Sequence, residues 1–93
     1  MTRIQDCAKL LGGAGCRRAM EEAVADYPIS AQQHLSKPSG RRPWIGQAAC
    51  CRALDATEEE TRIAWNFYMT PEQQTRANEV ADSVIAKWEA MNA

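Results

Sequence analysis

The chain has 93 residues, of which 45% are hydrophobic and 25% are charged, and its formal net charge is −1 at pH 7. This length suits one domain, and this composition is that of a folded globular protein rather than a disordered one. No apolar run approaches the roughly 20 residues that cross a bilayer, and Asp6 and Lys9 interrupt the segment where a secretory signal needs an unbroken apolar block. We therefore expect a single cytoplasmic domain over residues 1–93 that has no membrane partner.

The N-terminal third of the sequence is predicted to be helical, but the number of helices in it is left open. The stretch IQDCAKLLGG is typical of a short helix stopped by Gly12 and Gly13, and GCRRAMEEAVADYP is typical of a helix that Pro28 ends. These two segments form either two helices or one kinked helix. Downstream, ISAQQHLS is compatible with a turn or two of helix, and KPSGRR is a loop by its proline, glycine and serine content.

The stretch RRPWIGQAACC predicts the start of a buried helix that runs from Pro43 to Leu54, because proline suits a first helical position. Gly46 costs about 1 kcal/mol inside a helix, which indicates a packing reason for its presence. Arg52 falls on the apolar face and must either extend its charged head past the core or find an acidic partner. The residues expected on this face are Trp44, Ile45, Ala48, Ala49 and Cys51, with Leu54 at its edge.

Two further helices are predicted by their first residues. Thr57 is followed three residues later by Glu60, and Thr70 by Gln73, and both patterns form capping boxes. Pro71 fits the first position of the second of these helices. The expected apolar faces are Ile63, Ala64, Phe67 and Tyr68, with Trp65 beside them, in a short helix over residues 57–68, and Ala77, Val80, Ala81, Val84, Ile85, Trp88 and Met91 in the last helix.

The pattern contains no strand signal and no internal repeat. All the predicted elements are helical, and three tryptophans are distributed among the last three of them. The sequence therefore predicts an all-α fold, a small bundle of four to five helices around a tryptophan-rich core.

The cysteines and the single histidine do not form a recognisable chemical site. Cys7, Cys16, Cys50 and Cys51 lack Cys-x-x-Cys spacing, and neighbours on a helix point about 100° apart, so a zinc site with His34 is disfavoured. We expect reduced thiols in or near the core, and a disulfide between Cys7 and Cys16 only in an oxidising compartment. No serine or cysteine near His34 stands in a nucleophile context, so no catalytic, metal or cofactor site is predicted.

Charge is distributed unevenly along the chain. Residues 34–52 carry only basic charges, whereas residues 53–93 carry eight acidic groups against three basic ones. A basic segment beside a helix N-terminus suits an anionic partner. The alternative is a solvated loop whose arginines pair with the acidic C-terminal half of the same molecule. The candidate partner-binding residues are His34, Lys37, Arg41, Arg42 and Arg52 in the basic segment and Glu58, Glu59 and Glu60 on the acidic helix face.

The order HLS, RRPWIGQAACC, TRIAW and TPEQQTRANEVADSVIAKWE, over roughly residues 30–90, resembles small uncharacterised helical proteins encoded by phages and prophages. The resemblance concerns an arrangement and carries over no enzymatic activity and no functional residue. It implies a non-catalytic module that binds a host protein or complex, such as an inhibitor of a host defence system in the manner of anti-CRISPR proteins. Residues 1–29 lie outside it.

A helical nucleic-acid-binding transcriptional regulator and a structural or assembly component are the alternatives. A recognition helix places its first turn against the phosphates of DNA. The triple glutamate Glu58 to Glu60 would repel phosphates there, which disfavours a regulator of this type. Nucleic acid then has a route only through the basic loop, by way of Arg41 and Arg42.

Overall fold

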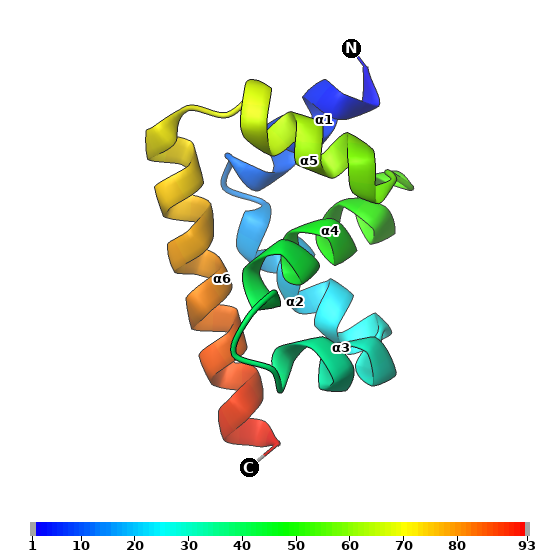
Figure 1. Ribbon diagram of the computed structural model, residues 1–93, viewed down its shortest axis with the longest axis vertical. Helices are drawn as coiled ribbons and strands as arrows, with labels where there is room; N and C mark the ends of the chain where they lie inside the picture. The colour runs from blue at the N-terminus through cyan, green and yellow to red at the C-terminus, as the bar shows by residue number, and fades with distance from the viewer. Residues whose placement is uncertain (1, 93) are drawn as a thin grey trace.

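The computed structural model describes residues 2–92 and shows an all-α domain, with six helices and no strand in that range. The helices are α1 (Arg3–Leu11), α2 (Cys16–Asp26), α3 (Pro28–Leu35), α4 (Arg41–Leu54), α5 (Glu58–Phe67) and α6 (Pro71–Met91) (Figure 1). The all-α class is confirmed, but the expected count of four to five is wrong. The N-terminal third forms two separate helices, and the segment expected to make a turn or two of helix forms α3, whose eight residues begin at Pro28. None of the described helices is both long enough and apolar enough to cross a membrane.

The two helix starts predicted from capping boxes are confirmed in atomic detail. Thr57 and Thr70 each accept a hydrogen bond from the backbone N–H three residues on, at 3.1 Å, and the side chain of that third residue accepts from the threonine N–H at 2.9 Å. Thr2 and Gln5 form the same capping box at the start of α1, a pattern that the sequence analysis did not single out. Three of the six helices thus begin where local side-chain hydrogen bonds satisfy their first N–H groups.

The helix α4 begins two residues earlier than the sequence predicts. Gly40 adopts a left-handed conformation with φ 82°, which favours glycine because it lacks a Cβ atom. This turn directs the chain into a helix at Arg41, so Pro43 is the third helical residue rather than the first. The two arginines expected in a loop therefore belong to the first turn of α4.

The six helices pack around the contact between α2 and α4 (Figure 1). The contact between α2 and α4 is the most extensive in the molecule, and α5 packs mainly on α1. The long helix α6 runs along one side and contacts α1, α2 and α4. The short helix α3 contacts only its neighbours α2 and α4 to any extent, so it lies at one end of the bundle.

The predicted tryptophan-rich core is not observed. Trp44, Trp65 and Trp88 are only partly buried and pack against the outside of the core. Most of the buried apolar residues are alanines and cysteines. The largest fully buried side chains are Leu11, Met20, Leu35, Ile45, Cys7 and Cys50.

Four residues assigned to apolar faces are exposed instead. Phe67, the last residue of α5, and Tyr68, which follows it, are 78% and 53% exposed. Met91 is likewise exposed in the last turn of α6. On α4 the buried face includes Cys50, so its neighbour Cys51 is rotated by about 100° toward solvent. Periodicity located the face of each helix but not the length over which a neighbour covers it.

Replacement of Ile45 by alanine tests the position of the core. Ile45 is fully buried, so Ile45→Ala should lower the free energy of unfolding by about 2–5 kcal/mol through lost burial and the cavity that remains. Ile29, exposed on α3, is the matched control, and Ile29→Ala should change it by less than about 0.5 kcal/mol. Urea denaturation monitored by circular dichroism measures both free energies of unfolding. Equal losses for the two variants would show that Ile45 is not part of the core.

Candidate functional site

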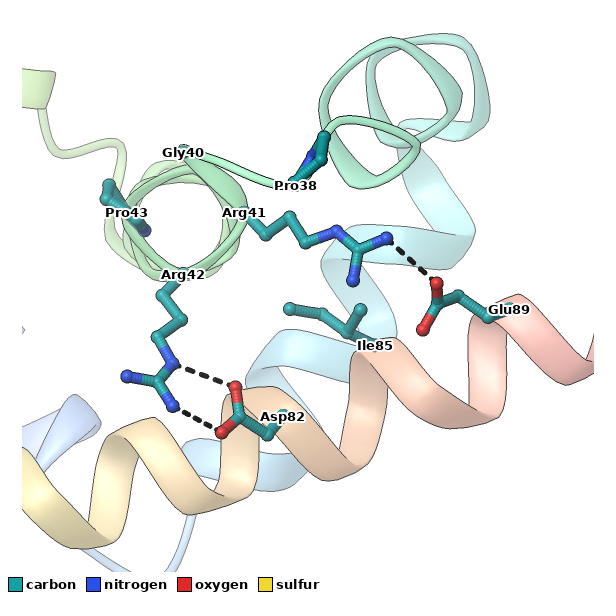
Figure 2. Close-up of a pocket in the computed structure, with 8 residues that line it drawn as sticks. All are labelled: Pro38, Gly40, Arg41, Arg42, Pro43, Asp82, Ile85 and Glu89. Carbon is teal, nitrogen blue, oxygen red and sulfur yellow. Dashed lines mark hydrogen bonds and ion pairs between the residues drawn. The ribbon is translucent and has the colours of Figure 1, made fainter.

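The first turn of α4 is bound to α6 by two adjacent arginines (Figure 2). Arg42 donates two hydrogen bonds to the carboxylate of Asp82, the one from Nε being 2.8 Å long. Arg41 donates from Nη2 to Glu89 at 2.8 Å. The side chain of Ile85 lies between the two ion pairs. The two neighbouring arginines thus reach carboxylates that are two turns apart on α6. This is the intramolecular pairing that the sequence left open as an alternative.

The hollow around these ion pairs is a weak candidate for an anion site. It has a volume of about 490 Å³ and is lined by the two arginines, their two carboxylate partners, Pro38, Gly40, Pro43 and Ile85. An incoming phosphate or carboxylate would have to compete with two acidic groups that already hold the guanidinium groups. Competition of this kind removes most of the attraction that the sequence suggested.

Arg52 has also found acidic partners. Its guanidinium group hydrogen-bonds to Asp26 and lies 3.6 Å from Glu22, and both carboxylates belong to α2. Of the two alternatives predicted for this residue, the acidic partner is the one observed. The pair links the last turn of α4 to the end of α2 across the surface of the bundle.

The remaining members of the basic segment differ in their surroundings. His34 stacks on Trp44, with ring centroids 5.4 Å apart and planes inclined by 9°, and its Nδ1 lies 2.9 Å from the carbonyl oxygen of Ser30. Lys37 is exposed and makes no ion pair with any residue from 2 to 92. The structure therefore does not gather the five basic candidates into one patch.

The three glutamates of α5 separate in the same way. Glu60 accepts from the Thr57 N–H and lies 3.3 Å from Nε of Arg3, and the Thr57 hydrogen bond in particular lowers the pKa of its carboxyl. Glu59 is only 3.9 Å from Arg62, at the limit of an ion pair. Glu58 is exposed and pairs with no cation among the described residues. Glu60 is thus structural, and Glu58 keeps its charge available.

The cysteines occupy core and surface positions rather than a metal centre. Cys7, Cys16 and Cys50 are buried, and burial raises the pKa of each thiol. Cys51 is exposed on the outer side of α4. Over residues 2–92 no three histidine, cysteine, aspartate or glutamate side chains are grouped so that they could hold a metal ion.

A groove between α4, α5 and α6 escaped the sequence analysis. The helices α4 and α5 are joined by a short turn and diverge toward α6, which closes the open end of the wedge (Figure 1). The groove has a volume of about 420 Å³. Leu11 and Gly46 lie on its floor, and Pro43 and Trp65 supply apolar walls. The other lining residues are Arg42, Gln47, Glu58, Thr61, Arg62 and Asn78.

Gly46 has no packing reason to be glycine. A Cβ atom at this position would meet only Cδ1 of Leu11, at 3.9 Å, which is an ordinary contact. By contrast, a Cβ at Gly13 would lie 2.7 Å from the carbonyl oxygen of Lys9. The expected packing reason is therefore wrong for Gly46, and its helix-destabilising cost of about 1 kcal/mol coincides instead with an open groove floor. That cost is the signal by which the sequence could have pointed to the groove.

A second hollow, of about 410 Å³, lies between α2, α3 and the end of α6. Val24, Pro28, Trp88 and Met91 are among its apolar lining residues. Its two charged residues, Glu21 and Lys87, lie 3.4 Å apart and neutralise each other. We refer to it as the α2–α3–α6 hollow.

Replacement of Gly46 by alanine tests whether the glycine is a cost to the fold. The added methyl group has room and removes backbone entropy from the unfolded chain, so Gly46→Ala should raise the free energy of unfolding by about 0.5–1 kcal/mol. Gly13→Ala is the control, and should destabilise because of its close contact with Lys9. A loss of stability on Gly46→Ala in urea denaturation would restore a packing role for the glycine.

Acid titration tests the arginine pairs. The hydrogen bonds from Arg42 lower the pKa of the Asp82 carboxyl, so its contribution to stability is complete above the unfolded pKa of about 3.9 and is lost as the pH falls through the lower folded value. The melting temperature of Asp82→Asn should therefore fall below that of the wild type at neutral pH and converge with it in acid. Arg42→Gln should behave in the same way, and a pH-independent difference would contradict this account.

Comparisons with known proteins add no identification to this geometry. No protein-family model matches the chain, and no curated protein and no solved structure is significantly similar to it.

Proposed function

We propose that the chain is a non-catalytic protein-binding module that holds a segment of its partner in the groove between α4, α5 and α6. The observation that carries the proposal is Gly46, a buried helix-interior glycine that lines the groove and that packing does not require. Stability given up at a surface hollow is typical of a position kept for binding. The apolar floor and walls with polar groups at the rim are the usual composition of a binding groove.

The arrangement of charge supports a protein partner over a nucleic acid. Binding to DNA or RNA depends on cations that are free to neutralise phosphates. Arg41, Arg42 and Arg52 are each engaged by carboxylates of the same molecule, and exposed Glu58 and Glu59 lie at the start of α5. Regulation of transcription through the basic loop is the weaker proposal for this reason.

The resemblance to small phage and prophage proteins suggests which partner to look for. A module without catalytic groups acts by occupying a surface that its target needs. We accordingly extend the proposal to a cytoplasmic inhibitor of a host protein or complex, of the anti-CRISPR type. The groove is the part of the molecule that this proposal assigns to the contact.

Affinity capture from bacterial lysate, with a variant that fills the groove, tests the proposal. Gly46→Leu places a side chain on the groove floor and should abolish capture of the specific partner. Ala53→Leu adds the same side chain at an exposed position of the same helix and should leave capture unchanged. Circular dichroism and melting temperature establish that both variants are folded.

Two results would contradict the proposal. One is capture that survives Gly46→Leu undiminished in a folded protein. The other is DNA binding that remains tight when the salt concentration rises from about 50 to 200 mM, because weak phosphate contacts should be lost over that range.

A further inference from the structure

We infer that the segment held in the groove presents an apolar side chain to the floor at Gly46 and Leu11, together with a lysine or arginine that pairs with Glu58. The inference rests on the proposed function and adds the chemistry of the partner. It follows from what lines the groove and from which of its charges remain unpaired.

The apolar requirement comes from the floor and the walls. Leu11 is fully buried beneath the groove, Gly46 leaves its floor without a side chain, and Pro43 and Trp65 face the space from α4 and α5. The volume of about 420 Å³ lies within the range of pockets that enclose a small ligand or a large side chain. An aliphatic or aromatic group fits these surfaces, because burial there removes apolar area from water on both partners.

The basic requirement comes from the charged residues at the rim. Arg42, Glu58 and Arg62 are the charged residues that line the groove. Arg42 is neutralised by two hydrogen bonds from its guanidinium group to Asp82, and Arg62 lies 3.9 Å from Glu59. Glu58 has no ion-pair partner within residues 2–92. Arg62, which is at the limit of an ion pair with Glu59, balances only one of the two exposed glutamates Glu58 and Glu59, so one negative charge remains at the rim. A cation beside the apolar anchor complements it.

The α2–α3–α6 hollow lacks this signature. Its lining charges, Glu21 and Lys87, are already paired with each other, and its floor contains no glycine. Probes that differ only in charge should therefore bind this hollow with similar affinities. The two hollows can therefore be told apart by one set of probes that differ only in charge.

Three small molecules with a common skeleton provide the test, namely 3-phenylpropylamine, 3-phenylpropanol and 3-phenylpropanoate. Titrated into the ¹⁵N-labelled protein, the amine should shift the Gly46 amide and the Trp65 indole N–H resonances with an affinity in the millimolar range. It should bind about two- to fivefold more tightly than the alcohol, as one exposed ion pair allows. The acid should bind more weakly than either.

Matched variants assign the preference to one carboxylate. Glu58→Gln should abolish the preference for the amine and leave binding of the alcohol unchanged. Glu72→Gln, which removes an exposed carboxylate of α6 outside the groove, should leave the preference intact. Equal or tighter binding of the acid, shifts confined to the α2–α3–α6 hollow, or no shift with any probe would overturn the inference.

The capture experiment, repeated with a Glu58 variant, distinguishes a failure of this inference from a failure of the proposed function. If Gly46→Leu abolishes capture while Glu58→Lys leaves it unchanged, the groove binds the partner but the basic group is wrong. If both substitutions abolish capture in folded protein, both statements are supported. If the species lost on Gly46→Leu is a second copy of this chain, as concentration-dependent sedimentation would show, the inferred foreign partner is wrong.

Discussion

The close crossing of α2 on α4 is the contact on which the remaining structure depends. Both helices contribute small buried side chains, Ala19 and Ala23 from α2 and Ala48 and Ala49 from α4. The three tryptophans are only partly buried and pack against the core from outside. The interior is consequently built from many small contacts, which together supply dispersion and burial at native density.

The orientation of α4 then determines what its two ends do. Its first turn faces α6, where Arg41 and Arg42 reach two carboxylates, and its last turn faces α2, where Arg52 reaches two more. Toward α6 the helices α4 and α5 diverge (Figure 1), and the groove of about 420 Å³ is lined by residues of these three helices and Leu11 of α1. The same helix that closes the core therefore also supplies the floor and one wall of the candidate site.

Charge that looks segregated in sequence is largely cancelled in space. The basic middle of the chain meets acidic groups on α2 and α6, so the surface is less polarised than the linear order suggests. Individual exposed pairs of this kind contribute little to stability, but they withdraw cations from any partner. The negative charge of Glu58 beside an apolar groove is a more specific feature than the basic segment, because the arginines of that segment are paired within the molecule.

The sequence by itself determined where the last two helices begin, because a capping box needs only residues three apart. Thr57 and Thr70 therefore predicted α5 and α6 correctly. The tertiary structure alone decided which side chains are covered and which charges are paired. Arg42 and Asp82 are 40 residues apart, and Phe67 is exposed although the sequence assigned it to an apolar face. Hydrogen bonds between residues close in sequence can be predicted from the sequence, whereas burial and ion pairing depend on how whole helices pack.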